Sequence, residues 1–313
     1  MRRFLIALAV LAVAGLAVFW LLTAPRMLSA SDLPSHTPDV ANGEQVFLAG
    51  GCASCHAAPK DGKCDNGRYQ DEHVLAGGRC LITPFGTFNV PNISSDKAHG
   101  IGAWTTLDFA NAMVRGVSPG GSHYYPAFPY TSYQRMTLTD VIDLKGYLDT
   151  LPASANVAPP HDLALPFRLR RGLGLWKLLF LDGKPFTPDP GASAEANRGK
   201  YLVDGAGHCG ECHTERNLAG GFVTAKWLAG GPAPEGDGWV PNLTPAPDGL
   251  ADWSKGDLVY LFQTGSLPDG DSIGGSMVAV QEHLAKLKEG DLDGIAVYLK
   301  ALKPIPNPRP KRK

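Results

Sequence analysis

The chain has 313 residues, of which 44% are hydrophobic and 19% charged, and its formal net charge at pH 7 is −1. This composition argues against a disordered chain, and the near-neutral charge gives no support to nucleic-acid binding. The length allows one large domain or two of ordinary size, and the 37 glycines and 26 prolines predict short helices joined by long loops.

The first residues predict a membrane anchor. Arg2 and Arg3 precede an uncharged run, Phe4–Leu22, that is nineteen residues long. As a helix this run would span roughly 28 Å, close to the thickness of a hydrocarbon core. A cleaved signal peptide is the competing interpretation, but its apolar region is usually shorter, and Leu28-Ser29-Ala30 is a poor cleavage site. We expect an uncleaved anchor over residues 1–30, inserted in the cytoplasmic membrane, with the remainder of the chain in the periplasm.

The pentapeptide Cys52-Ala53-Ser54-Cys55-His56 is the first motif that carries chemistry, and Cys209-Gly210-Glu211-Cys212-His213 repeats its pattern. Two thiols one helical turn apart can add to the two vinyl groups of a porphyrin, and the adjacent histidine can ligate its iron. A zinc ribbon would need its ligands in one small module, whereas these pairs lie 157 residues apart. A thioredoxin-like dithiol would need a βαβ context. The sequence therefore predicts two covalently bound haem c groups, held by Cys52, Cys55, His56, Cys209, Cys212 and His213.

Two further cysteines, Cys64 and Cys80, lie outside these motifs. In an oxidising compartment a disulfide between them would close a loop of about 15 residues and contribute about 3 kcal/mol of stability. The alternative is two unrelated buried thiols. Both cysteines stand in polar, glycine-rich sequence, where a core cysteine is not expected, so we predict the disulfide.

The chain contains an internal repeat. Each haem motif is followed by Leu-Ala-Gly-Gly and then Val-Pro-Asn, and Trp104 and Trp253 are each followed by Asp after four residues and Gly after twelve. Landmarks that recur in one order indicate two copies of one unit. The predicted boundaries are 39–151 for the first domain, 152–191 for a connector, 192–302 for the second domain, and 303–313 for a basic, proline-rich tail that we expect to be extended or disordered.

The periodic signals within both copies are helical. Serine or threonine is available as an N-cap for several of these segments, and no strand pattern has comparable strength. The expected fold class is all-α, with two tandem domains behind one transmembrane helix. The connector carries an apolar and basic stretch, 163–181, which would pack across the domains or lie on the membrane surface. The predicted helices are 39–49, 106–114 and 137–148 in the first copy, and 194–203, 254–263 and 289–302 in the second.

The sixth iron ligand decides whether a haem transfers electrons or carries out chemistry. In the second copy Met277, the only methionine there, is the predicted ligand. The matching position of the first copy, counted from the tryptophan, is Phe128, which cannot ligate iron. Met136, immediately before the last helix, is therefore the predicted ligand of the first haem. His123, Met113 or no protein ligand are the alternatives, and Met136 could instead pack against the start of that helix.

Four segments carry a resemblance to a known family: 83–87, 90–93, 125–133 and 207–214. Both copies resemble class I cytochrome c domains. The chain after Asp32 resembles dihaem cytochrome c proteins related to the cytochrome subunits of membrane-bound alcohol, aldehyde and gluconate dehydrogenases. Many of those relatives have a methionine where this chain has Phe128, and many carry a third haem motif, which this chain lacks.

These features predict an electron carrier of a periplasmic respiratory chain rather than an enzyme. It would take electrons from a dehydrogenase and pass them to a quinone, a soluble cytochrome or a terminal oxidase. No catalytic acid, base or nucleophile is conspicuous. The alternative is a dihaem enzyme of the peroxidase or thiosulfate dehydrogenase type, which would need an open or unusual axial position at the first haem.

Overall fold

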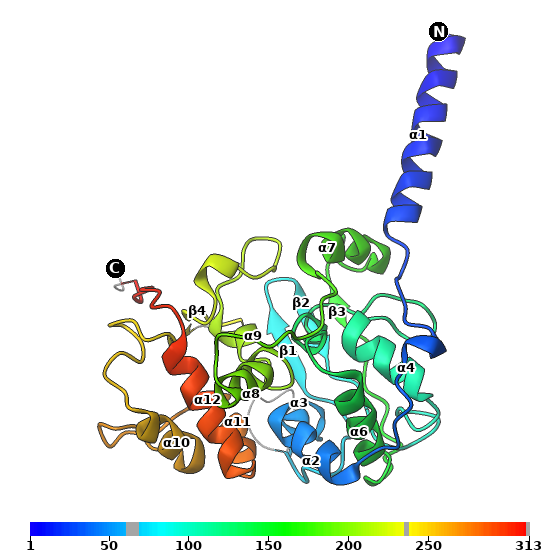
Figure 1. Cartoon of the computed structure of the whole chain (residues 1–313). Coiled ribbons are helices and arrows are strands. Elements are labelled where there is room, and N and C mark those ends of the chain that lie inside the picture. The colour runs from blue at the N-terminus through cyan, green and yellow to red at the C-terminus, as the bar shows by residue number, and fades with distance from the viewer. Residues whose placement is uncertain (61–68, 235–237, 311–313) are drawn as a thin grey trace.

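The computed structural model describes residues 1–60, 69–234 and 238–310, and it consists of a helical rod that projects from a mainly helical body (Figure 1). The rod is α1 (Arg2–Leu22), which has no buried residue. Within the described ranges it is the one helix long and apolar enough to cross a membrane. A short 3-10 turn, η1 (Ala30–Asp32), lies between this rod and the body.

The first half of the body is built around two helices that pack against each other, α2 (Val40–Ala49) and α6 (Leu138–Leu148). Asp39 caps α2 by accepting bonds from two backbone amides, and Thr137 caps α6 by accepting a bond from the amide of Asp140. Both predicted helices are therefore confirmed to within one residue. The shorter elements of this half are α3 (Cys52–His56), α4 (Thr106–Ala110), the π-helical turn η2 (Asn111–Arg115) and α5 (Tyr130–Tyr133).

The second half repeats this arrangement with α8 (Ala194–Asp204) packed on α12 (Glu289–Ala301). Ser193 caps α8 and Ser254 caps the helix that follows the second tryptophan. The close helix crossing depends on Gly199, where an added Cβ would lie 1.8 Å from the carbonyl oxygen of Gly294. The other elements of this half are α9 (Gly210–His213), η4 (Thr224–Lys226), α10 (Lys255–Thr264) and α11 (Met277–Leu284).

Short strands correct the all-α prediction. Strands β1 (Cys80–Thr83) and β2 (Gly86–Asn89) form an antiparallel pair, and β2 also pairs with β3 (Asp162–Leu163) of the connector. A second pair, β4 (Gly231–Pro232) with β5 (Trp239–Val240), lies in the second half. These strands are two to four residues long, too short for a visible period-two pattern, and β3 lies far from its partner in the sequence. Helices nonetheless dominate the body.

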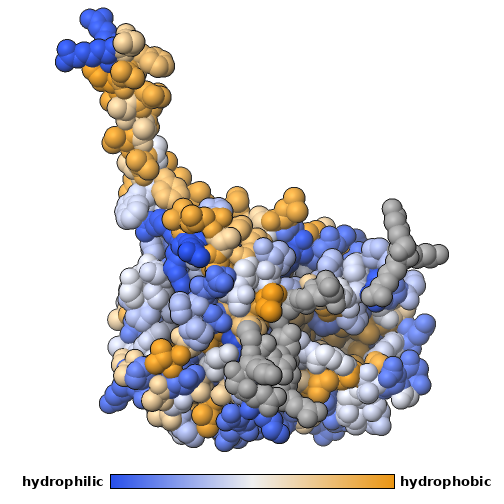
Figure 2. Space-filling model, turned by 180° about the vertical axis from the view of Figure 1, so that it is seen from behind, coloured by the Kyte–Doolittle hydropathy of each residue, from blue (hydrophilic) through white to orange (hydrophobic). Residues whose placement is uncertain are grey.

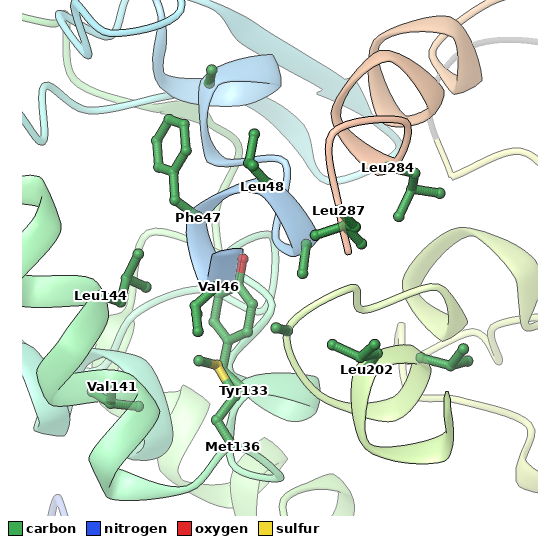
Figure 3. Packing of buried hydrophobic residues seen from close by; sticks show 14 of the residues in the cluster. Val46, Phe47, Leu48, Tyr133, Met136, Val141, Leu144, Leu202, Leu284 and Leu287 are labelled. Atoms are coloured by element: carbon green, nitrogen blue, oxygen red, sulfur yellow. The ribbon is translucent and has the colours of Figure 1, made fainter. Parts of the chain in front are cut away.

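One hydrophobic core runs through both halves. Val46, Tyr133, Met136 and Leu144 of the first half belong to the same buried cluster as Leu202 of the second. Figure 3 shows these side chains directed toward one another from their separate elements. The two copies are therefore packed against each other and are not separate domains joined only by a linker.

The connector contributes the 3-10 turn η3 (Arg170–Gly172) and helix α7 (Leu173–Phe180), and it contacts both halves. Lys177 Nζ donates to the carbonyl oxygens of Arg115 and Gly116, each at 2.7 Å. On the other side, Trp176 Nε1 donates to the carbonyl oxygen of Ala219 at 2.8 Å.

The tail was expected to be extended or disordered, and its described part, residues 303–310, is irregular. It carries no helix or strand, but the Ile305 amide donates to Thr244 Oγ1 at 3.1 Å, and Asn242 Nδ2 donates to the Ile305 carbonyl at 2.8 Å. These bonds attach the start of the tail to the second half.

Candidate haem-binding sites

The first Cys-x-x-Cys-His motif forms the short helix α3, which begins after Gly51 in a left-handed conformation. His56 Nδ1 lies 2.9 Å from the carbonyl oxygen of Pro91. A carbonyl can only accept, so Nδ1 carries the proton and Nε2 keeps the lone pair that a metal requires. Histidines that ligate metals are oriented in this way by a partner on the other ring nitrogen.

The second motif has the same geometry. His213 Nδ1 lies 2.9 Å from the carbonyl oxygen of Pro241, which occupies the equivalent Val-Pro-Asn turn. Two histidines separated by 157 residues therefore have the same partner at the same distance. The sequence pattern located the repeated turn but did not identify its proline carbonyls as histidine partners.

The asparagine of each turn holds the turn in place. Asn92 Nδ2 donates to the carbonyl oxygens of Ser154 at 2.7 Å and Asn156 at 2.9 Å. Asn242 instead reaches the carbonyl of Ile305. In both halves the asparagine is buried, and the backbone carbonyls that its amide reaches lie just after the final helix of that half. The segment that follows each copy therefore positions the proline carbonyl, and through it the histidine.

The repeated Leu-Ala-Gly-Gly segments also contact the histidines. The Gly77 amide donates to the His56 carbonyl at 2.7 Å, and the Gly230 amide donates to the His213 carbonyl at 2.8 Å. Both glycines have positive φ, and an added Cβ would come within 2.5 Å of backbone atoms of the Val-Pro-Asn turn. Glycine is needed here because the backbone passes too close for any side chain.

Burial sets the protonation states of the motifs. It lowers the pKa of His56 to about 4, although the bond to Pro91 acts in the opposite direction, and it lowers the pKa of His213 as well. Burial also raises the pKa of Cys52 and Cys209 to about 12. At neutral pH the imidazoles of His56 and His213 are thus neutral, and the thiols of Cys52 and Cys209 are protonated. This chemistry fits haem c, which needs an unprotonated imidazole nitrogen on iron and two thiols beside its vinyl groups.

The structure places the candidate ligands of the first haem in two different regions. Met136 is 3% exposed, and it lines a small cavity together with Cys52, Met113 and Tyr133. Figure 3 shows Met136 next to Tyr133 and Val46. By contrast, His123 Nε2 donates to the carbonyl oxygen of Thr23 at 2.9 Å, at the base of α1. The structure therefore brings both methionine candidates to the first motif and holds His123 elsewhere.

Met277 is the first residue of α11 and is partly buried, packed against the common core. Phe128 is also partly buried, and its ring packs against those of Tyr124 and Tyr133. Cys80 is buried at the start of β1. Cys64 lies outside the described residues, so the disulfide remains a prediction.

Sequence reasoning missed the role of Glu211 inside the second motif. Its carboxylate accepts bonds from Thr131 Oγ1 at 2.5 Å and Ser132 Oγ at 2.9 Å, and it forms an ion pair with Arg216. Thr131 and Ser132 belong to α5 of the first half. Nothing in the pentapeptide indicates such a partner, because the contact depends on how the two halves pack.

Comparisons with known proteins agree with these sites. The cytochrome c family profile matches residues 40–152. The protein named diheme cytochrome c-type of Cereibacter sphaeroides is 48% identical over 97% of this chain and 100% of its own length. The fructose dehydrogenase cytochrome subunit of Gluconobacter japonicus is 36% identical over 86% of this chain and 53% of its own length. The alcohol dehydrogenase (quinone) cytochrome c subunit of Komagataeibacter europaeus is 36% identical over 89% of this chain and 60% of its own length.

The chain thus covers the whole of the first relative but little more than half of the two dehydrogenase subunits. These names favour an electron carrier over the alternative of a peroxidase or thiosulfate dehydrogenase. Together with the paired histidine geometry, they identify the family. The chain belongs to the cytochrome c family, in the group that contains diheme cytochrome c-type proteins and the cytochrome subunits of fructose and alcohol dehydrogenases.

Proposed function

We propose that the chain carries electrons through two covalently attached haem c groups, one on each Cys-x-x-Cys-His motif. Haem iron supplies one-electron redox chemistry when bound. The observation that carries the proposal is the repeated bond from histidine Nδ1 to a proline carbonyl, 2.9 Å in both halves. It leaves Nε2 of His56 and His213 free to ligate iron, in an orientation that the surrounding backbone fixes.

Each half then forms one haem domain, 39–151 and 192–302, with the connector 152–191 between them. Support comes from the matched helix pairs, α2 with α6 and α8 with α12, in each of which the first helix immediately precedes the motif in the chain. The common core favours two haems held at a fixed separation, which suits transfer from one to the other.

Met136 and Met277 are the proposed sixth ligands. Met136 is supported by its burial and by the cavity that it shares with Cys52. The Met136 amide donates to the Tyr133 carbonyl at 2.9 Å, and the next amide, of Thr137, donates to the hydroxyl of Tyr201 at 3.0 Å. These bonds fix the backbone around the thioether. A methionine thioether bound to the iron would raise its potential and would leave no position open for a substrate.

The α1 helix is proposed as an uncleaved anchor in the cytoplasmic membrane, with the haem domains in the periplasm. The support is its length, its lack of buried residues and the pair Arg2 and Arg3 at its start. An oxidising periplasm would also favour the disulfide between Cys64 and Cys80, which peptide mapping without reductant would detect as a linked pair.

The proposed electron donor is a dehydrogenase, and the acceptor is a quinone, a soluble cytochrome or a terminal oxidase. The donor is inferred from relatives that are named as dehydrogenase subunits. To test this, the membrane-bound chain is purified and each protein that accompanies it is identified. Substrate of a co-purifying dehydrogenase should reduce both haems in the intact complex. Reduction by dithionite but by no co-purifying enzyme would contradict a dehydrogenase as the donor.

A further inference from the structure

The body holds the end of α1 in a fixed position beside α7. Arg171 Nε donates to Thr23 Oγ1 at 2.9 Å, and the guanidinium lies 4.2 Å from the centre of the Trp20 ring. His123 Nε2 also donates a hydrogen bond to the carbonyl oxygen of Thr23. Gly174 lies so close that an added Cβ would be 2.6 Å from the Cα of Thr23. The rod therefore leaves the body at one defined place, next to the connector.

The connector residues around this exit point expose apolar side chains. Leu165 is 73% exposed, Leu169 64% and Leu179 75%. The nearby loop 217–221, which Trp176 holds through its bond to Ala219, adds the fully exposed Leu218. We call this set the connector surface; its apolar members are Leu165, Phe167, Leu169, Leu175, Leu178, Leu179 and Leu218.

The connector surface lies on the side of the body from which α1 projects. In Figure 1, α7 lies at the level where the rod meets the body. Figure 2 shows hydrophobic colour continuing from the rod onto the adjoining face of the body. Helix α10 lies on the opposite side of the body, away from the rod (Figure 1).

The charge of this segment fits a lipid headgroup layer. Residues 163–181 contain four basic side chains and no acidic one; Arg168, Arg170 and Arg171 are exposed or partly exposed, whereas Lys177 is buried. Arg168 is well exposed, and its nearest carboxylate, that of Asp162, lies 3.8 Å away and is itself exposed. Arg170 and Arg171 hold the exit point by bonding to the carbonyl of His123 and to Thr23. Exposed leucines beside exposed basic side chains are typical of segments that lie in the interface of a bilayer.

We infer that the connector surface rests in the headgroup region of the same bilayer leaflet that α1 enters. This inference rests on the proposed anchor. A monomeric soluble body rarely leaves such a set of apolar side chains uncovered. Because α1 is bonded to the connector, insertion of the rod brings the connector surface to the lipid, and the contact gives the haem body one orientation on the membrane.

The test uses the full chain, with α1 confirmed by intact mass, in phospholipid nanodiscs that contain a photoactivatable acyl-chain lipid. Lipid adducts are mapped to peptides. The expected result is labelling of α1 and of 165–181, with the connector peptide labelled about tenfold more than the α10 peptide. Labelling of α1 alone, with 165–181 no higher than α10, would overturn the inference and leave the anchor standing. Labelling of 165–181 without α1 would support the surface and count against the anchor, and labelling of neither would overturn both.

Variants sharpen this test. Leu165→Glu with Leu179→Glu changes two side chains that are more than 70% exposed, so the fold should be retained. It should reduce labelling of 165–181 about tenfold while labelling of α1 persists. Tyr260→Glu on α10, a residue 56% exposed, is the matched control and should change neither peptide. Equal labelling of the connector in the double variant and the control would also contradict a lipid contact through these leucines.

Discussion

The carboxylate of Glu211 accepts a hydrogen bond of 2.5 Å from the hydroxyl of Thr131. Glu211 stands inside the second haem motif, and Thr131 stands five residues before the proposed ligand Met136 of the first haem. Both side chains are buried, and Arg216 balances the charge of the carboxylate. This bond ties the proposed attachment site of one haem to the proposed ligand segment of the other, so it should fix the geometry between them.

Glu211→Gln should therefore loosen the junction of the two halves. Thr131 and Ser132 both donate to Oε1 of Glu211, and Arg216 donates to Oε2. The amide has only one acceptor oxygen, so it cannot serve both sides and it loses the ion pair, which should lower the free energy of unfolding by about 1–3 kcal/mol. Electron exchange between the haems, measured after rapid reduction of only part of the haem, should be slower than in the unchanged chain. Glu44→Gln, at an exposed position of α2, is the control. Equal stability and equal exchange rates in the two variants would show that Glu211 does not hold the halves together.

Met136→Leu and Met113→Leu separate the two methionines that line the cavity beside Cys52. Both changes conserve volume and should cost less than about 1.5 kcal/mol in packing. Only Met136→Leu should lower the midpoint potential of one haem and remove its thioether–iron absorption band, because methionine ligation raises the potential. Redox titration of each variant measures this. If Met113→Leu gives that result and Met136→Leu does not, the ligand is Met113.

Asn92→Ala and Asn242→Ala form a matched pair across the repeat. Each variant removes the side chain that holds one Val-Pro-Asn turn. The proline carbonyl of that turn, which orients one histidine, is then no longer fixed in place. Loss of these buried bonds should cost about 1–3 kcal/mol. Asn92→Ala should disturb the spectrum of the haem at His56, and Asn242→Ala that of the haem at His213. Identical effects of both variants on one haem would contradict the independence of the two sites.

The buried carboxyl group of Asp204 should make the free energy of unfolding depend on pH. Burial raises its pKa from 3.8 to about 6, against the bond donated by the Tyr298 hydroxyl. A raised pKa in the folded state gives stability that is complete below pH 4 and is lost as the pH rises through 6. Asp204→Asn stays neutral, so it should gain up to about 3 kcal/mol over the wild type between pH 4 and pH 7. Urea unfolding at both pH values measures this, and a constant difference between the two proteins would contradict it.

The sequence located the haem motifs and most helices because those signals are local. Asp39 and Thr137 are N-caps that can be read from the chain, and their helices begin within one residue of the prediction. The repeated Val-Pro-Asn and Leu-Ala-Gly-Gly segments could be found but not explained. These segments contact the histidines through backbone carbonyls and amides. Every residue has such groups, so the residue types in the sequence do not reveal the contacts.

What escaped prediction depends on contacts between distant segments. Strand β3 exists because Leu163 meets Gly86, and its two residues have no periodicity of their own. The composition of the tail predicts an extended or disordered segment, and it does not indicate that Asn242 and Thr244 bond to Ile305. The two hydroxyl partners of Glu211 lie 79 and 80 residues away in the chain. Such pairings follow from packing of the whole body and not from any single window.

The most direct test of the central claim is the haem content of each motif, measured by intact mass and haem absorbance of the chain and two double variants. The account predicts two covalently bound haems in the unchanged chain. It predicts one haem in Cys52→Ser with Cys55→Ser and one in Cys209→Ser with Cys212→Ser, with different remaining spectra. A single haem in the unchanged chain, or a double variant that keeps both haems, would contradict it.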